Sequence, residues 1–488
     1  MKKEKLGHGD GRGLEKNGVV SGFYTAKEVD FWYNKRRAKQ GHELSAMLRA
    51  KIKWEVIIVY LKKLSLKNFK CFEKLDIDFH KQLTVLVGVN GAGKTSILEA
   101  TAIAVSTMFA PMDGPKGIGI DKTQAHLKAY AIGSTNDVQP QYPVNVSATA
   151  MIDGGEVKWE RCLNTANGST TIKEAKEIIA VAADYQKRLR DGDATLILPV
   201  LAYYGTGRLW DYHREKQTDI FETSTRTNGY IDSTCGTASI KLMMNWFAKM
   251  TVQKYQNQEN GLGPVPELEA VYAAMERCYT QITGADDVKI QYHIGTRELE
   301  IIYTDKTGER MRMPMNQLSD GYKGTISLVA DIAYRMAVLN PQCLRDVCRK
   351  TDGIVLIDEV DLHLHPAWQQ RILEDLTSIF PNVQFIVTTH APEIINSVSK
   401  ENVVVIENKL AMPAPAETYG KDANGILRSI MRVKERPELI MERFDEFYRT
   451  IDTGNYAEAG KILEHLENVV GEDPELASMR VQLDLEQL

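Results

Sequence analysis

The sequence predicts an α/β fold with a mixed sheet, on the evidence of three observations. Residues 83–87 form a short apolar run typical of a buried strand, and a glycine-rich loop and a helical pattern at 96–104 follow it directly. Residues 353–357 and 385–389 are two more runs of buried-strand type, and each is followed by polar side chains. Residues 75–79 alternate between apolar and polar side chains, which predicts a half-buried strand in addition.

The chain divides into three parts. Residues 1–55 are polar and glycine-rich at first and then carry a basic run at 35–37. We interpret them as an appendage, which is either a docking or nucleic-acid arm or a solvated face. Residues 56–408 are predicted to form the head, with a helical insertion at about 205–285. Residues 409–488 are predicted to be a loop followed by a C-terminal helical region.

Periodicity and turn chemistry predict the individual elements of these parts. A hairpin is expected around residues 153–155, where an Asp-Gly-Gly turn separates two strand patterns. The other expected strands are residues 56–60, 64–69, 197–204 and 403–406, and the expected helices are 172–190, 239–255, 266–282, 325–338 and several after 426.

Composition and charge narrow the class of protein. With 43% apolar and 26% charged residues over 488 positions, the chain has the composition of a folded globular protein. Its formal charge of −5 gives no general attraction to phosphate backbones, so DNA binding would need a local basic patch or a partner chain. The cysteines form no C-x-x-C pair, and there is neither an apolar run of about eighteen residues nor a signal-peptide pattern. We therefore expect a cytoplasmic protein that does not span a membrane.

The loop at residues 88–95 matches the G-x-x-x-x-G-K-[ST] pattern and lies between a predicted strand and a predicted helix. Its glycines let backbone N–H groups surround phosphate oxygens, and the helix N-terminus favours negative charge. Lys94 is expected to reach the β- and γ-phosphates of ATP, and Thr95 to bind Mg²⁺ through its hydroxyl. A plain glycine-rich turn is the alternative. The predicted nucleotide-binding residues here are Gly88, Asn90, Gly91, Gly93, Lys94, Thr95 and Ser96.

Two acids follow the strand at residues 353–357, and a parallel sheet would bring them to the same edge as the phosphate loop. Asp358 is expected to hold the Mg²⁺ hydration shell, and Glu359 to polarise the attacking water as the catalytic base. Two solvated acids at the end of a strand are the alternative. The presence of the phosphate loop favours the catalytic interpretation.

Residues 318–322 read Leu-Ser-Asp-Gly-Tyr, precede a helical pattern and resemble the signature motif of ABC ATPases. The resemblance implies that Ser319 and Gly321 contact the γ-phosphate held by the other subunit of a dimer. Asp320 and Tyr322 depart from the motif, and a carboxylate near a γ-phosphate would be repulsive unless it caps the helix. A simple helix N-cap is the alternative interpretation.

Three further residues correspond to elements of ABC ATPases. His390 follows the strand at 385–389 and matches the switch histidine, which would make it a second catalytic residue. Asp361 matches the D-loop that crosses the dimer interface, which argues against reading the nearby His363 and His365 as a zinc pair. Gln124 is the nearest candidate for the Q-loop glutamine, a ligand of Mg²⁺.

The runs at residues 318–322, 356–366 and 385–392 together resemble RecF/SMC-like bacterial ATPases, in particular the PtuA family of Septu anti-phage systems. The resemblance covers roughly residues 60–488. It implies an ABC/SMC-type P-loop ATPase head with a mixed sheet, a helical insertion and a C-terminal helical extension. It also implies that ATP acts largely as a regulator, that the heads form a homodimer or a higher oligomer, and that a separate HNH nuclease, PtuB in that family, cuts DNA as part of the complex.

Three other functions compete with a nuclease-controlling ATPase. A self-contained RecF/SMC-like DNA clamp is the serious rival, although the 263 residues between Lys94 and Asp358 hold several strands and short helices, a pattern too interrupted for SMC coiled-coil arms. An OLD-type nuclease would need a Toprim domain within the 98 residues after His390, which instead read as one strand and helices. A transporter ATPase is disfavoured by the large insertion and the C-terminal helices.

Overall fold

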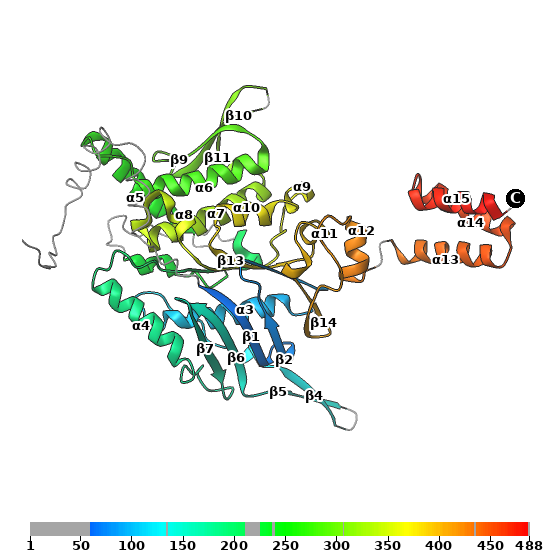
Figure 1. Cartoon of the computed structure of the whole chain (residues 1–488), viewed down its shortest axis with the longest axis horizontal. Helices are drawn as coiled ribbons and strands as arrows, with labels where there is room; N and C mark the ends of the chain where they lie inside the picture. The colour runs from blue at the N-terminus through cyan, green and yellow to red at the C-terminus, as the bar shows by residue number, and fades with distance from the viewer. Residues whose placement is uncertain are drawn as a thin grey trace, which may run out of the picture. The chain divides into compact units, whose positions relative to one another are not determined.

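The computed structural model describes residues 59–132, 135–209, 225–236, 240–305, 307–433 and 436–486 (Figure 1). The appendage expected at residues 1–55, with its basic run, lies outside the described residues, and so does most of the strand expected at 56–60.

Four antiparallel strands form the first sheet, in the order β2-β1-β6-β7. The burial of β6 alternates residue by residue, because its two faces meet different surroundings. Asp153 and Gly154 turn the β6–β7 hairpin, both with positive φ, as the sequence predicted. The strands are β1 (Tyr60–Phe69), β2 (Phe72–Asp78), β6 (Val144–Ile152) and β7 (Gly155–Leu163).

Six strands form the second sheet, in the order β15-β14-β3-β13-β12-β8, and all are parallel except β15 at one edge. Their bounds are β3 (Leu83–Val87), β8 (Val200–Tyr204), β12 (Gly353–Ile357), β13 (Val383–Thr389), β14 (Val403–Glu407) and β15 (Leu410–Pro413). Strands β3, β13 and β12 are neighbours and run the same way, so the residues after each of them meet at one edge of the sheet.

Helix α3 (Lys94–Val105) contacts β6 of the first sheet as well as β8, β12 and β13 of the second. Most of its side chains are buried, which fits a helix packed between two layers. This layered arrangement is the α/β fold with a mixed sheet that the sequence predicted.

The helical insertion contains α5 (Ile240–Glu259) and α6 (Pro266–Thr283), as expected. A three-stranded sheet that the sequence analysis did not predict follows directly, and its strand β9 contacts α6. Its strands are β9 (Asp286–His293), β10 (Glu298–Thr304) and β11 (Arg310–Pro314). The unpredicted hairpin of β4 (Leu127–Ile132) and β5 (Thr135–Pro140) lies at the bottom of Figure 1, with nearly all of its residues exposed.

The boundary expected at residue 408 falls inside the β14–β15 hairpin, so the head's sheet continues to Pro413. Asn408 and Lys409 make this two-residue turn with positive φ and without a glycine, which left no turn signal in the sequence. Near the C-terminus, α13 (Glu438–Asp452), α14 (Tyr456–Val470) and α15 (Pro474–Glu486) pack around a core of their own that includes Phe447, Leu463 and Met479.

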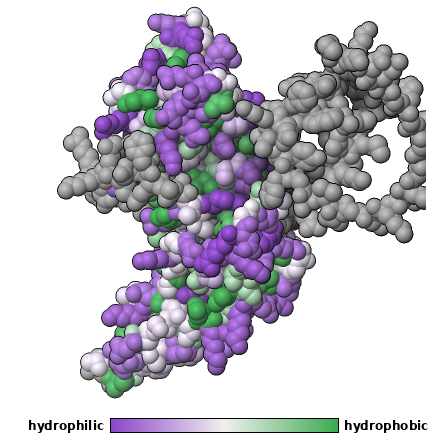
Figure 2. Space-filling model, turned by 90° about the vertical axis from the view of Figure 1, so that its left-hand side faces the viewer, coloured by the Kyte–Doolittle hydropathy of each residue, from purple (hydrophilic) through white to green (hydrophobic). Residues whose placement is uncertain are grey.

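The remaining helices are α4 (Lys176–Arg190), α7 (Asp320–Leu339), α8 (Val347–Lys350), α9 (Pro366–Gln369), α10 (Ile372–Ile379), α11 (Pro392–Ile395) and α12 (Ala423–Ile426). Within the described ranges, none of the helices combines the length and the apolar character needed to cross a bilayer. The face shown in Figure 2 is mainly hydrophilic, with hydrophobic residues in small separate patches.

Candidate functional site

The loop between β3 and α3 has a backbone that only glycine adopts easily. Gly91 and Gly93 have φ of 79° and 105°. A Cβ atom at Gly93 would lie 2.4 Å from the ring of Phe72, and one at Gly88 would lie 2.5 Å from the Ile406 carbonyl oxygen. These positions therefore need glycine for conformation and for space, and the loop they form surrounds the start of a twelve-residue helix.

The Lys94 side chain folds back into this loop, and only 6% of the residue's surface is exposed. Its Nζ donates to the carbonyl oxygen of Gly88 at 2.8 Å and to that of Val89 at 3.2 Å. Burial lowers the pKa of its ammonium group, while the nearby carboxylates, chiefly those of Asp358 and Glu359, act in the opposite direction. A buried cation held by carbonyl oxygens beside a helix N-terminus fits a phosphate anion.

Asp358 lies at the carboxyl end of β12 and is 2% exposed. Its two carboxylate oxygens accept hydrogen bonds from Thr95 Oγ1 at 2.8 Å and from Thr388 Oγ1 at 2.6 Å. The backbone N–H of Glu359 also donates to Thr388 Oγ1, at 2.7 Å. Hydroxyl and carboxylate oxygens are the donor set that Mg²⁺ prefers, so Thr95 and Asp358 fit this ion.

Glu359 has φ of 47°, an uncommon conformation for a residue with a side chain. It lines the same pocket as Lys94 and Thr95, together with His390 at the end of β13. Burial and the positive charge of Lys94 lower the pKa of His390 against the opposing effect of neighbouring carboxylates. His390 is therefore neutral near pH 7 and has a nitrogen able to accept a proton or a hydrogen bond.

Asp361 lies two residues beyond Glu359, and its Oδ1 accepts a hydrogen bond from Thr389 Oγ1 at 2.7 Å. Thr389 Oγ1 in turn accepts from the N–H of Ala391 at 2.9 Å. The threonine pair at the end of β13 thus holds the carboxylates of Asp358 and Asp361. The sequence analysis missed this role, although the two adjacent hydroxyls before His390 were visible in the sequence.

The pocket around these residues has a volume of about 450 Å³. Its lining residues are Lys70, Cys71, Asn90, Gly91, Gly93, Lys94, Thr95, Ser96, Asp358, Glu359 and His390. Most of the residues predicted from the phosphate loop and the acidic strand are therefore brought together. Lys70 and Cys71 were not predicted, because they come from the β1–β2 turn, where no motif marks them. Lys70 also forms an ion pair with Glu99 of α3.

Gln124 does not line this pocket. Its side-chain Oε1 accepts from the N–H of Asp121 at 2.9 Å, within a capping box of a short 3₁₀ turn, and its carbonyl oxygen accepts from the N–H of Lys70 at 2.7 Å. The Gln124 side chain therefore caps a local turn. The assignment of Gln124 as a Mg²⁺ ligand stays a prediction.

The signature segment lies at the start of α7 and outside the Lys94 pocket of the same chain. Ser319 is the N-cap position, but its side chain makes no capping hydrogen bond. Asp320 does not cap the helix either, since it is the first helical residue, and its carboxylate lies 3.6 Å from Lys323 Nζ. The expected repulsion from Asp320 is therefore reduced by a neighbouring cation.

A buried polar network links α7 to the strand next to β12. Asp331 and Arg335 form an ion pair at 2.7 Å, and each is 1% exposed. Tyr204 donates from its hydroxyl to Asp331 at 2.7 Å, and its carbonyl oxygen accepts from the N–H of Asp358 at 2.8 Å. Arg335 also donates to the carbonyl oxygens of Gly229 and Ile231, both at 2.9 Å, so these buried hydrogen bonds connect the signature helix to the strand beside β12.

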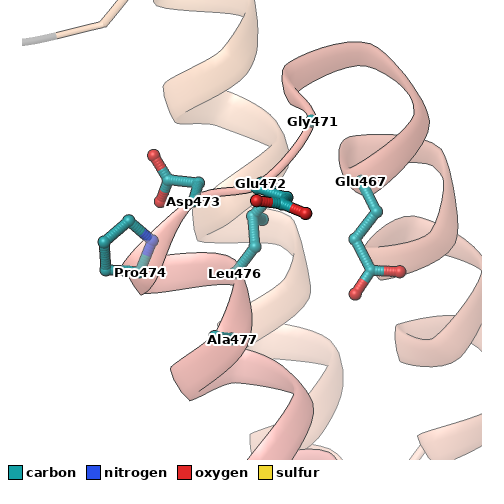
Figure 3. A pocket seen from close by; sticks show the side chains of 7 residues that line it. All are labelled: Glu467, Gly471, Glu472, Asp473, Pro474, Leu476 and Ala477. Carbon is teal, nitrogen blue, oxygen red and sulfur yellow. The ribbon is translucent and has the colours of Figure 1, made fainter.

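A larger pocket, of about 700 Å³, lies between α14 and α15 (Figure 3). Glu467, Glu472 and Asp473 line it, and Glu467 and Glu472 extend from opposite sides of it in Figure 3. Asp473 is paired with Arg436 at 3.0 Å. These carboxylates would repel a triphosphate, so the smaller pocket at the phosphate loop is the better candidate for the nucleotide site.

Models of known protein families match the parts of the chain that contain this site. Two family models described as AAA domains match the chain, one over residues 63–277 and the other over 209–396. The phosphate loop, the acidic strand and these matches together show that the chain is an ATPase.

Among individual proteins, the chain is similar to the retron Ec83 probable ATPase of Escherichia coli, with 26% identity over 86% of this chain and 85% of that protein. It is also similar to the Septu protein PtuA of Bacillus thuringiensis, with 23% identity over 82% of this chain and 91% of PtuA. The solved SMC head bound to the C-winged helix domain of ScpA aligns with a TM-score of 0.45 and 17% identity, over 72% of this chain and 97% of that chain. The resemblance to the Septu ATPases is thus confirmed. The retron probable ATPases are further relatives, which the sequence analysis did not name.

Proposed function

We propose that this ATPase is the nucleotide-controlled regulatory subunit of an anti-phage defence complex, and that two copies of its head sandwich two ATP molecules. The observation that carries the proposal is the separation of Ser319 from the Lys94 pocket within one chain. Because the signature serine lines a different pocket, a second copy is needed to bring it to a nucleotide bound at Lys94.

In this proposal Lys94 binds the β- and γ-phosphates, and Thr95 and Asp358 hold Mg²⁺, which supplies positive charge to the triphosphate. Glu359 orients and polarises the attacking water, and neutral His390 accepts a hydrogen bond at the same place. Ser319, Gly321 and Asp361 of the second copy complete the site. Turnover can be slow, because a regulatory nucleotide acts through binding as well as through hydrolysis.

The proposed partner is an HNH nuclease that cuts DNA under the control of the ATPase. The similarity to Septu PtuA and to a retron ATPase over most of the chain supports a defence role. The net charge of −5 supports DNA contact through the complex rather than through this chain alone.

The test combines Glu359→Gln with Lys94→Ala. With ATP and Mg²⁺, Glu359→Gln should bind nucleotide and accumulate as a closed dimer in light scattering, whereas Lys94→Ala should not dimerise. A Glu359→Gln protein with undiminished turnover would remove this residue from the role of base.

The partner is tested by expressing the tagged chain together with its native operon neighbours and identifying the co-purifying proteins by mass spectrometry. A small HNH nuclease in defined stoichiometry supports the defence ATPase. Recovery of this chain alone, together with salt-sensitive DNA binding, would favour the self-contained DNA clamp instead.

A further inference from the structure

A third pocket, of about 380 Å³, opens beside the signature segment. It lies between the end of α6, the strands β10 and β11, and the residues that lead into α7. Its lining includes Tyr279, Tyr303, Tyr322, Gln317 and Ser319. One wall of this pocket is therefore the signature serine, and the rest is rich in tyrosine.

The tyrosines form a connected aromatic cluster. The ring centroid of Tyr279 lies 5.5 Å from that of Tyr303 and 6.1 Å from that of Tyr322. Tyr322 is held from the other side by Trp368, at 4.2 Å between centroids. Since Tyr303 and Tyr322 are only partly buried, the cluster presents aromatic surface to the pocket while its own packing keeps the rings in place.

The phosphate-loop pocket lacks such a surface. Among the described residues that line it, none is Phe, Tyr or Trp, and its polar and glycine-rich walls suit phosphates and a metal ion. A nucleotide bound there would have no aromatic side chain in that pocket on which its base could stack. Base stacking on aromatic rings is a strong and common means of holding a nucleotide base.

We propose that the tyrosine pocket binds the base of the nucleotide whose phosphates lie on the phosphate loop of a second copy. This inference rests on the proposed head dimer. Ser319 would face the terminal phosphate and the neighbouring tyrosines the base, so one face of the copy that carries the tyrosine pocket recognises both ends of a nucleotide held by the other copy. Tyr322, which departs from the ABC signature, would then help Tyr303 to bind the base.

The test uses two differently labelled copies, each with one defective half-site. The first copy carries Lys94→Ala and supplies only its signature face, and the second carries Ser319→Arg and supplies only its phosphate loop. ATP should bring the two together at a single intact composite site, which is measured by energy transfer between the labels. Adding Tyr303→Ser to the first copy should weaken this association about tenfold, the size of a lost base–aromatic stack.

The same substitution on the second copy should have little effect, because its signature face is already defective. Tyr303→Phe keeps the ring and should retain the association, which separates stacking from misfolding. Tyr255→Ser removes a tyrosine that is 54% exposed on α5 and is the matched control. Tripolyphosphate, which has no base, should support weak association that Tyr303→Ser does not reduce further.

The outcomes separate the two proposals. If ATP brings no copies together even in the unmodified protein, the head dimer fails and the inference fails with it. If the copies associate but Tyr303→Ser acts equally from either copy or not at all, only the assignment of the base is overturned. Binding of AMP by the Lys94→Ala copy alone, lost with Tyr303→Ser, would assign the pocket to a free nucleotide and also overturn the inference.

Discussion

Gly321 lies so close to His363 that a Cβ atom at position 321 would come within 2.5 Å of the His363 carbonyl oxygen. This contact seats the signature segment on the loop that follows the acidic strand, where His363 has φ of 61°. In the proposed head dimer, the face offered to a second copy would therefore be joined within one chain to the residues proposed to hold its own nucleotide. The contact gives a structural route by which dimerisation and nucleotide state can affect each other.

Gly321→Ala should disrupt this contact, because the neighbouring group is backbone and cannot simply rotate away. We expect turnover and ATP-induced dimerisation to fall at least tenfold, with a loss of about 1–3 kcal/mol in stability from overpacking. ATP affinity of the single chain should stay within about twofold, since Gly321 does not line the Lys94 pocket. Gly263→Ala, at a glycine with open space, is the control for steady-state hydrolysis and thermal melting.

Thr388 should matter for metal binding, although it carries no charge. Thr388→Val would leave the buried Asp358 with one hydrogen bond fewer and the N–H of Glu359 without its acceptor, at a cost of about 1–3 kcal/mol. We expect weaker Mg²⁺ dependence of hydrolysis and a lower melting temperature, and Thr388→Ser should restore both. Hydrolysis at the normal Mg²⁺ requirement in Thr388→Val would contradict this role.

Lys94→Ala should abolish nucleotide binding without unfolding the chain. The ammonium group is buried and its pKa is lowered, so its removal relieves a desolvation cost while it takes away the cation that binds phosphate. Calorimetry should detect no ATP binding, and thermal melting should shift by little. Lys74→Ala is the control, because the Lys74 side chain is 80% exposed and away from the pocket.

Asp352 should make stability depend on pH. Burial raises the pKa of its carboxyl group to about 7, although the N–H of Val59 donates to it at 2.7 Å. As pH rises from about 4 to 7, the unfolded chain loses this proton before the folded chain does, so the free energy of unfolding should fall. Asp352→Asn should flatten that slope in denaturant titrations at several pH values, while an unchanged slope would exclude Asp352 as its source.

Much of the site follows from residues that are close together in the sequence. The phosphate loop could be predicted because glycines, a lysine and a hydroxyl within eight residues are what a phosphate cradle requires between a strand and a helix. The acids at Asp358 and Glu359 and the histidine at His390 could be predicted because parallel buried strands end at one edge of a sheet. That the chain is an ATPase could therefore be predicted from the sequence alone.

The rest was decided by tertiary structure. Lys70 and Cys71 join the nucleotide pocket only because the β1–β2 turn packs on α3, and Gln124 stays out of it because its side chain caps a local turn. The β9–β11 sheet, the tyrosine pocket and the contact between Gly321 and His363 bring together residues that are far apart along the chain. Such contacts depend on strand order and packing, which local sequence patterns do not encode, whereas the motifs are local backbone chemistry that a short stretch of sequence specifies in full.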